Sequence, residues 1–483
     1  MRNALPSFKG NSVSSVSFWQ KLETSMRARD SLLCVGLDPR REQIPPHYAT
    51  LADFNRAIID ATAHLACIYK PNIAFYEALG RAGMDALRET IAYVPEDIPV
   101  LLDAKRNDIA STAQAYAKAA FEDLGADALT VNPYLGADGV APFLEYEERG
   151  VFLLCKTSNP SAGELQDWSQ GGVSLYRHVA QLAESWAGGR AIGLVVGATY
   201  PEILAQVRAA HPNAWFLVPG VGTQGGDLEA VVHAGLRADG LGLLINSSRG
   251  IIHAEDPRAA AATLHRQINA ARKKASLSPA LSERDAEVRL LSRVLYEADC
   301  LRFGDFVLHS GAHSPVYVDM RRLVTYPRAL DIVARSYVKL LNPLQYDRIA
   351  AIPYAALPIG TAVALQTGDP LIYPRHEAKV YGTRQRIEGE FQPGERAVLL
   401  DDLITRGGSK LEARQVLVEE GLIVEDVVVL LDREQGGTED LAQQGVRLHA
   451  ALTLREAVDS LAGLGLLDSA DARRVRDYLA GEP

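Results

Sequence analysis

Two carboxylates and an ammonium stand close together at the end of an apolar run. The stretch "LLDAKRND" brings Asp103, Lys105 and Asp108 within six positions of one another. Asp103 and Lys105 can share one strand face at a period of two, whereas Asp108 lies beyond the strand end. A lone buried charge tends to neutralise, but alternating signs keep one another ionised. The pattern fits either a charge array for catalysis or a solvated ion pair in the following loop.

A second group of polar residues follows another apolar run. In "RAVLLDDLITRGGSK", residues 396–410, Asp401 and Asp402 precede Thr405, a glycine pair and a helix start. Loop N–H groups and a helix N-terminus can cradle a phosphate. A carboxylate pair can accept hydrogen bonds from ribose hydroxyls. The stretch therefore predicts a ribose 5′-phosphate site, and the alternative is an acidic turn that caps a helix.

The first group belongs to a series of eight apolar runs between about residues 30 and 270. Helical patterns, such as those over 112–125 and 174–189, lie between the runs. Eight alternations of strand and helix in about 250 residues predict an α/β fold of the parallel (β/α)₈ barrel (TIM barrel) type, with its active site at the carboxyl ends of the strands. That edge would collect the end groups of these runs: Asp38, Lys70, Asp103, Asn132, Gly220 and Ser248.

The second group belongs to a different domain. Residues 268–290 change from a charged helix end to Ser and Pro and then to a new helical pattern, which indicates a linker near 275–285. Four or five further apolar runs alternate with helical patterns and predict a smaller open α/β sheet. We therefore expect one domain over 18–275 and another over 285–483.

Composition limits the classes of partner. The chain has 483 residues, of which 47% are hydrophobic and 23% charged, and its formal net charge is −10. This balance is typical of a soluble globular protein and argues against a general binder of nucleic acid or anionic membranes. No run approaches the ~20 apolar residues of a membrane span. Four scattered cysteines without CxxC spacing favour free thiols in a reducing compartment, and the N-terminus lacks the apolar core of a secretory signal, so we expect a cytoplasmic protein.

The chain from about 18 to 272 resembles the orotidine 5′-phosphate decarboxylases. The resemblance rests on "GLDPR", "KPNIAFYE", "DAKRND", "PGVGTQGGD" and "SSRG"; DxKxxD alone also occurs in related phosphosugar barrels. It implies Lys105 as the proton donor beside Asp103, and Asp108 reaching the partner subunit's site in a homodimer or larger homo-oligomer. No metal or other cofactor is implied for this step. The implied substrate-binding residues are Asp38 and Lys70 for ribose hydroxyls, Ser158 for the pyrimidine amide, Gln224 and Arg249 for phosphate, and Thr130 near the ribose of the neighbouring site.

Residues 290–480 resemble the orotate phosphoribosyltransferases, members of the type I phosphoribosyltransferases. The carrying stretches are 303–321, 352–365, 374–389, 396–410 and 427–437. The resemblance implies phosphoribosyl diphosphate and orotate as substrates, and Mg²⁺ carried mainly by the diphosphate and hydroxyls. It implies a covering loop with Arg375, His376, Tyr381 and the catalytic Lys379, a ribose-phosphate site at Asp401, Asp402, Arg406, Gly407, Gly408 and Ser409, and orotate contacts from Tyr317, Thr405 and Arg433.

Several residues depart from the transferase pattern. His376 replaces the usual Lys, His309 and His313 stand where basic residues are common, and Ala355 stands where many bacterial members carry Lys. Histidine is only partly charged near neutral pH, so we expect weaker or pH-dependent binding of diphosphate.

The two resemblances imply consecutive steps that lead to UMP in pyrimidine biosynthesis, with the decarboxylase half first in the chain. Two alternatives stay open. The C-terminal half could be a non-catalytic nucleotide-sensing or RNA-binding module beside an active decarboxylase. Otherwise, the barrel could be a phosphosugar lyase or an aldolase-like enzyme.

Overall fold

The computed structural model describes residues 16–221, 227–276, 282–307, 313–375 and 386–481. They form two compact units. The first holds the residues up to Gln166 together with Tyr176–Ser282, and the second holds Asp167–Leu175 and the residues from Glu283 on. Residues 277–281 of the expected linker lie outside the described residues, and the domain bounds 18–275 and 285–483 stay predictions.

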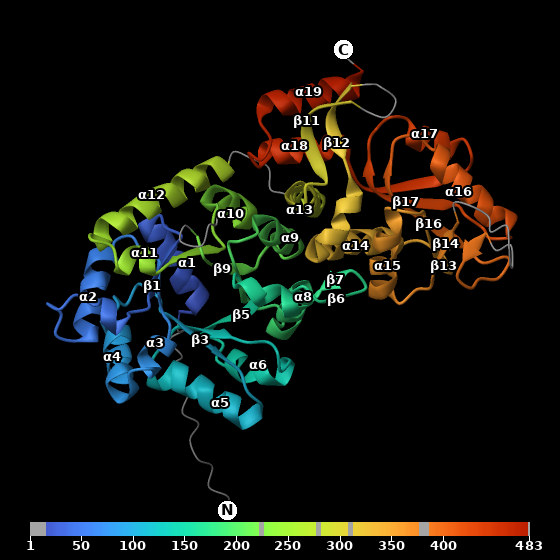
Figure 1. The fold of residues 1–483 in the computed structure, drawn as a ribbon. Helices are drawn as coiled ribbons and strands as arrows, with labels where there is room; N and C mark the ends of the chain where they lie inside the picture. Colours follow the sequence, from blue (N-terminus) through green and yellow to red (C-terminus); the bar gives the residue numbers. More distant parts are fainter. Residues whose placement is uncertain (1–15, 222–226, 277–281, 308–312, 376–385, 482–483) are drawn as a thin grey trace, which may run out of the picture. The chain divides into compact units, whose positions relative to one another are not determined.

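Eight parallel strands form the barrel of the first unit (Figure 1). Their order is β2-β1-β10-β9-β8-β5-β4-β3, and parallel bridges from Tyr69 to Val100 and from Asn72 to Asp103 join the two end strands. Each predicted apolar run is one of these strands, so the predicted barrel is confirmed. The strands are β1 Leu33–Leu37, β2 Ile68–Pro71, β3 Leu101–Arg106, β4 Ala128–Val131, β5 Gly150–Lys156, β8 Gly193–Val196, β9 Trp215–Pro219 and β10 Leu243–Ser247.

Helices cover the outside of the barrel, which explains why the strands read as continuous apolar runs. All residues of β1, β2, β4 and β8 are buried. Capping boxes fix the starts of two helices, where Ser17 pairs with Gln20 and Thr50 with Asp53. The helices are α1 Phe18–Arg29, α2 Leu51–Thr62, α3 Ala74–Glu77, α4 Gly80–Tyr93, α5 Ala110–Lys118, α6 Ala137–Leu144, α7 Gly163–Gln166, α8 Leu175–Ala187, α9 Pro201–Ala210, α10 Leu228–Gly235, α11 Arg249–Ile252 and α12 Pro257–Ala275.

The second unit is built on an open six-stranded sheet in the order β15-β14-β13-β16-β17-β18, parallel except for β15. The predicted open sheet is confirmed, but its edge strand β18 and the separate β11–β12 hairpin were not anticipated. Both carry exposed or half-exposed residues, so neither reads as an apolar run. The strands are β11 Leu301–Val307, β12 His313–Val318, β13 Arg348–Ala351, β14 Leu371–Pro374, β15 Ile387–Glu388, β16 Ala397–Ile404, β17 Asp426–Asp432 and β18 Arg447–Thr453; a short hairpin, β6 Ser169–Gln170 with β7 Val173–Ser174, also falls in this unit.

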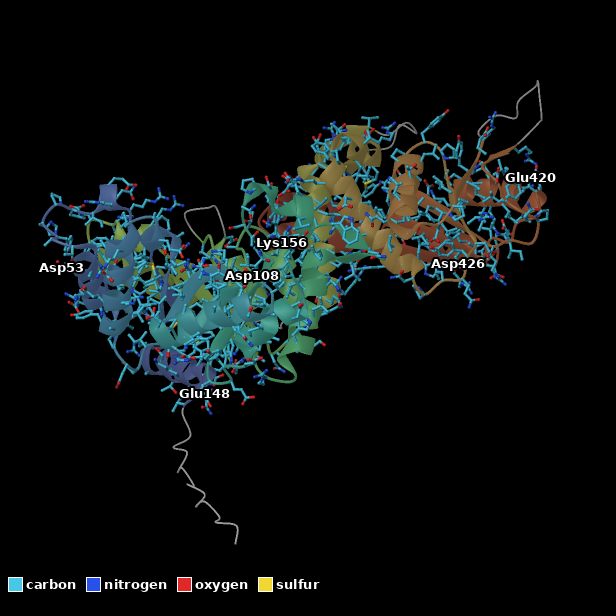
Figure 2. All side chains as sticks on the ribbon, turned by 90° about the horizontal axis from the view of Figure 1, so that it is seen from below. Asp53, Asp108, Glu148, Lys156, Glu420 and Asp426 are labelled. Atoms are coloured by element: carbon cyan, nitrogen blue, oxygen red, sulfur yellow. The ribbon has the colours of Figure 1, made fainter. Side chains whose placement is uncertain are left out.

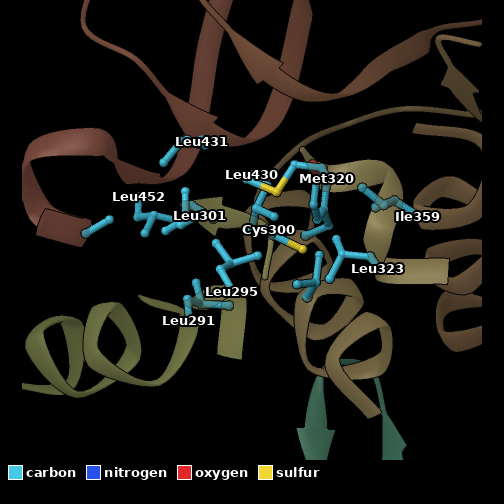
Figure 3. Packing of buried hydrophobic residues seen from close by; sticks show 14 of the residues in the cluster. Leu291, Leu295, Cys300, Leu301, Met320, Leu323, Ile359, Leu430, Leu431 and Leu452 are labelled. Carbon is cyan, nitrogen blue, oxygen red and sulfur yellow. The ribbon is translucent and has the colours of Figure 1, made fainter. Parts of the chain in front are cut away.

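Two apolar clusters lie on this sheet. One contains Leu295, Leu323 and Leu430, all at most 1% exposed (Figure 3). The other contains Leu399, Val429 and further residues from alternate strand positions. Burial of one such side chain stabilises the fold by about 1.5–3 kcal/mol. The helices are α13 Glu283–Glu297, α14 Pro327–Leu341, α15 Ala356–Thr367, α16 Gly408–Glu419, α17 Gly437–Ala442, α18 Leu454–Gly463 and α19 Ser469–Ala480.

Candidate active sites

Four predicted residues meet in one hydrogen-bonded array at the carboxyl ends of β2, β3 and β4. Asp103 Oδ2 accepts from Lys70 Nζ at 3.0 Å, and Asp103 Oδ1 accepts from Lys105 Nζ at 2.6 Å. The Thr130 hydroxyl donates to Asp103 Oδ1 at 2.9 Å. The side chain of Lys70 is 4% exposed, whereas that of Lys105 is 46% exposed. The Lys70 ammonium of the array is therefore buried, whereas the Lys105 ammonium is accessible at the carboxyl end of the barrel.

A local irregularity of β3 directs Lys105 to this position. Lys105 has a φ of 48°, and the register between β3 and β4 shifts between Leu102 and Arg106. A bulge of this kind re-aims a side chain at the rim of a barrel. Thr130 Oγ1 accepts the N–H groups of Ala104 at 3.0 Å and Lys105 at 2.9 Å, which holds the bulge in place. The expected meeting of Asp103 and Lys105 occurs, but through this bulge rather than a regular pleat.

The charges of the array stabilise one another. Burial favours the neutral form of Lys70, but attraction by Asp103 and Asp38 outweighs burial and raises the pKa of Lys70. Burial also opposes the charge on Asp103, yet Lys70 and Lys105 hold its pKa well below the usual range. Asp103 is therefore a carboxylate, and Lys70 an ammonium, at any pH near neutrality.

The first strand adds a further carboxylate to this end of the barrel. Asp38 Oδ1 accepts the Asn72 N–H at 3.1 Å, which ties the loop after β1 to the end of β2. Cys34 lies deeper in the barrel, where its thiol contacts Asn246 Oδ1 at 3.4 Å. Burial raises the pKa of the Cys34 thiol to about 12, so this thiol is not a nucleophile near neutral pH.

Asp108 stands apart from the array within its own chain. It follows β3 in the loop before α5 (Figure 2), and its Oδ1 accepts the Ile109 N–H at 2.7 Å. Within the described part of the chain, Lys105 pairs with Asp103, and no ion pair joins it to Asp108. Ile109, Tyr134 and Leu135 are exposed around this loop. The loops that precede α5 and α6 thus expose apolar side chains, and the Asp108 carboxylate has no ion-pair partner among the described residues.

The remaining predicted barrel residues lie on other strand ends. Ser158 follows β5, and a Cβ on Gly197 would lie 2.8 Å from the Ser158 Cβ, so only glycine permits this close approach of two loops. Arg249 begins α11 directly after β10 and is exposed. Gln224 lies outside the described residues.

Sequence interpretation missed a second polar cluster at the same barrel end. Arg40 Nε, Ser248 Oγ and His253 Nε2 are buried without a hydrogen-bond partner in the described structure. Burial and the positive charges of Arg40 and Arg249 lower the pKa of His253. Donors left without partners near two guanidinium groups suit an anion such as a phosphate. The signal available in the sequence was Arg40 itself, the last residue of "GLDPR".

The acidic pair of the second unit lies in the C-terminal half of the central strand β16. Asp401 Oδ2 lies 2.6 Å from Lys410 Nζ on α16, and both side chains are at most 10% exposed. Asp402 is half-buried, and burial together with the Asp401 charge raises the pKa of Asp402 to about 7. Asp401 is thus paired with an ammonium, whereas Asp402 titrates near neutral pH.

The loop after the pair is partly exposed, but one of its backbone N–H groups already has a partner. Asp440 Oδ2 accepts the Gly407 N–H at 3.2 Å, so a carboxylate already takes one donor of the expected phosphate cradle. A Cβ on Gly407 would lie 2.9 Å from the Asp440 Cβ, whereas Gly408 borders open space. Arg406 and Ser409 are exposed, and Thr405 is half-buried. Asp440, on α17, had no signal in the sequence.

The remaining predicted residues of this unit lie on or next to other strands. The Arg433 N–H donates to Ile404 O at 2.9 Å, and Arg433 Nε is buried without a partner in the described structure. Tyr317 lies on β12, with the Arg302 guanidinium 4.8 Å from its ring centroid. Arg375 pairs with Glu388, and the exposed His313 contacts Asp305. Ala355 precedes α15, while His309, His376, Lys379 and Tyr381 lie outside the described residues.

Two kinds of feature are absent from the described ranges. No cluster of three His, Cys, Asp or Glu side chains there could hold a metal ion. No helix in those ranges is long and apolar enough to cross a bilayer.

Comparison with known proteins identifies both halves. Residues 31–264 match the family "Orotidine 5′-phosphate decarboxylase / HUMPS family". The chain is 38% identical over 466 residues to the "Bifunctional enzyme PyrF/PyrE" of Nostoc sp., which covers 93% of this chain and 98% of that protein. The chain belongs to the bifunctional PyrF/PyrE family. The family resemblance inferred from the motifs of both halves is therefore confirmed.

Two further relatives extend this result. The orotidine 5′-phosphate decarboxylase of Cellvibrio japonicus is 50% identical over 274 residues, which are 53% of this chain and all of that protein. The structure of Leishmania donovani UMP synthase is 44% identical, covers 97% of this chain and 100% of that one, and superposes with a TM-score of 0.52. The family match thus extends over both units.

Proposed function

We propose that the chain catalyses two consecutive reactions of UMP biosynthesis. The second unit converts orotate and 5-phosphoribosyl 1-diphosphate to orotidine 5′-phosphate and diphosphate. The first unit decarboxylates orotidine 5′-phosphate to UMP and CO₂. The observation that carries the proposal is the ionised array of Lys70, Asp103 and Lys105 at the carboxyl ends of the barrel strands, in a chain whose full-length relative is bifunctional.

In the barrel, Lys105 acts as the proton donor. Loss of CO₂ from the pyrimidine leaves a carbanion, and an ammonium already in position stabilises that charge as it develops and then protonates the carbon. Asp103 holds this ammonium at 2.6 Å before substrate arrives, so little reorganisation is needed during the reaction. No residue in this scheme requires a metal or an organic cofactor.

Other barrel residues bind the substrate. Asp38 and Lys70 contact the ribose hydroxyls, Ser158 the pyrimidine amide, and Gln224 and Arg249 the phosphate. The unpartnered donors of Arg40, Ser248 and His253 support an anion at the same end of the barrel. The place of Thr130 near the ribose of the neighbouring site stays a prediction, while its bonds to the Lys105 loop support a positioning role within its own chain.

In the second unit, Asp402 accepts hydrogen bonds from the ribose hydroxyls, and the loop from Thr405 to Ser409 holds the 5′-phosphate. Arg433, with its unpartnered Nε, supports a contact to the orotate carboxylate, together with Thr405 and Tyr317. Arg375 and the loop that bears His376, Lys379 and Tyr381 cover the diphosphate. Both Asp401 oxygens are already taken, by Lys410 and by the Asp402 N–H, which supports Mg²⁺ carried by diphosphate and hydroxyls rather than by protein ligands.

The enzyme acts as a homo-oligomer in the cytoplasm, with small molecules as its partners rather than nucleic acid or membranes. Asp108 reaches the site of the partner subunit, and the exposed Ile109, Tyr134 and Leu135 beside it support burial against a second copy. All four cysteines are buried free thiols, which supports a reducing compartment.

A coupled assay tests the proposal. Orotate, phosphoribosyl diphosphate and Mg²⁺ are supplied, and orotate loss and UMP formation are followed separately. Chelator is expected to stop the first step and to leave decarboxylation of added orotidine 5′-phosphate intact. Decarboxylation without orotate consumption would favour the non-catalytic module, and failure of both steps would favour a phosphosugar enzyme.

A further inference from the structure

A buried lysine lies beneath the acidic pair of the second unit. Lys410 is in the first turn of α16 and is 5% exposed, although its neighbours Gly408 and Ser409 are exposed. Its Nζ lies 2.6 Å from Asp401 Oδ2 and 3.3 Å from Ser409 Oγ. A buried ammonium is costly unless it is paired. Its location therefore depends on Asp401, and the ion pair joins the start of α16 to the end of β16.

Asp401 is held at each of its acceptor groups. Oδ1 accepts the Asp402 N–H at 2.9 Å, and Oδ2 is paired with Lys410. The backbone oxygen accepts the Tyr337 hydroxyl of α14 at 2.6 Å. Asp401 is 7% exposed, so a ligand can reach it only by displacing these contacts.

Asp402 is less buried than Asp401 and has fewer partners. It is half-buried, its Oδ1 accepts the adjacent Leu403 N–H at 2.8 Å, and its carboxyl group also interacts with that of Asp401, but it forms no ion pair among the described residues. The charged and titratable groups that face it are Asp401 from its own strand, Lys410 from α16 and Tyr337 from α14. Asp402 therefore has the free acceptor capacity that Asp401 lacks.

We propose that Lys410 is a positioning residue of the transferase site, which fixes Asp401 as an immobile carboxylate and thereby assigns the contact with the ribose hydroxyls to Asp402. This inference rests on the proposed transferase function. Without the ammonium, the buried Asp401 and the half-buried Asp402 would hold one proton between them over a wider pH range. Asp402 would then ionise, and accept from the hydroxyls, only at higher pH.

The test is the pH profile of kcat/KM for orotate consumption by the full chain, with phosphoribosyl diphosphate and Mg²⁺. Wild type, Lys410→Met and Lys410→Arg are compared between pH 6 and 9. Lys339→Met is the matched control, because Lys339 forms a half-buried ion pair with Glu287 in the same unit, at 3.0 Å. The phosphates of the substrate titrate in the same way with each variant, so the differences between variants report the protein.

The acidic limb of Lys410→Met is expected to move upward by about one pH unit or more, so that kcat/KM at pH 7 falls about fivefold or more and recovers toward pH 9. Lys410→Arg retains the charge and should keep the limb near that of wild type, as should Lys339→Met. In the double variant Asp401→Asn/Lys410→Met, the repelling carboxylate is also lost, and the limb should return to the wild-type position or below.

An unchanged limb in Lys410→Met would overturn the inference, as would a loss of activity that is equal at every pH. Should Lys410→Met not accumulate, Asp401→Asn is compared with the double variant. The single variant keeps the ammonium, so its acidic limb should lie at a lower pH than that of the double variant. Identical limbs in these two would also overturn it. Absence of orotate consumption by wild type would instead contradict the proposed function.

Discussion

The two sites use opposite charge arrangements. In the barrel, one carboxylate, Asp103, lies between the ammonium groups of Lys70 and Lys105. In the second unit, two adjacent carboxylates, Asp401 and Asp402, lie near a single ammonium, that of Lys410, which pairs with Asp401. An excess of cations holds the barrel carboxylate ionised, whereas an excess of anions makes one carboxyl group titrate near pH 7. A fixed field suits the stabilisation of a carbanion, and an acceptor open to ligand suits the binding of hydroxyls.

The largest expected effect separates the two sites completely. Lys105→Ala should lower decarboxylation by about 10⁴-fold or more, because it removes both the proton donor and the fixed positive charge. Production of orotidine 5′-phosphate by the same variant should be unchanged. Both half-reactions are measured in each variant, with Lys118→Ala, at the end of α5, as the control. Equal loss of both reactions would show that the two sites are not independent.

A second experiment asks whether the barrel array is complete within one chain. Asp108→Ala and Lys105→Ala protomers are each expected to be inactive in decarboxylation. Mixed and re-associated in equal amounts, they should regain about a quarter of the wild-type rate, since half of the dimers would contain one intact site. Heterodimer formation is measured with two affinity tags. Heterodimers without any regained activity would contradict a site shared between subunits.

Stability should respond in opposite directions at the two sites. Asp103→Asn leaves the buried Lys70 without its carboxylate and should destabilise the barrel by about 3–5 kcal/mol. The pKa of Asp402 is raised to about 7 in the folded state, so this group lowers stability progressively as the pH rises from the ordinary carboxyl range to about 7, and the loss is complete above that pH. Asp402→Asn should therefore stabilise the second unit at pH 8, by about 1–3 kcal/mol.

Hydrogen exchange of the amides in β3 and β16 measures these changes separately for each unit. At pH 5 the gain from Asp402→Asn should shrink, because the native carboxyl group is then protonated. A gain that is equal at pH 5 and pH 8 would contradict the raised pKa.

The smallest expected effect concerns binding of the remote phosphate. Arg40→Met should raise KM for orotidine 5′-phosphate about tenfold and change kcat little, because a charge-assisted contact contributes about 1.5–3 kcal/mol. The matched control is Arg41→Met, since Arg41 is exposed. Decarboxylation of orotidine, which lacks the phosphate, should be equal in wild type and Arg40→Met. A loss with both substrates would assign Arg40 to the fold rather than to the phosphate.

Much of the architecture could be read from local patterns. Strands buried on both faces are continuous apolar runs, so that all eight barrel strands and the end groups Lys70 and Asp103 were predicted before their contacts were known. Edge strand β18 and the β11–β12 hairpin were not predicted, since half-exposed strands do not form continuous apolar runs. The bulge at Lys105 also escaped, because a φ of 48° at a non-glycine residue leaves no mark in the sequence.

The sequence by itself determined which residue types arrive at the strand ends, because strand periodicity and the chain order of a barrel are local properties. Only the tertiary structure decided which of these groups pair. A lysine on a helix is expected at the surface, but Lys410 is buried against Asp401. Asp440 accepts a hydrogen bond from Gly407, which lies 33 residues away in the chain. Ionisation depends on distance and burial, and both are set by packing between segments that are remote in the chain.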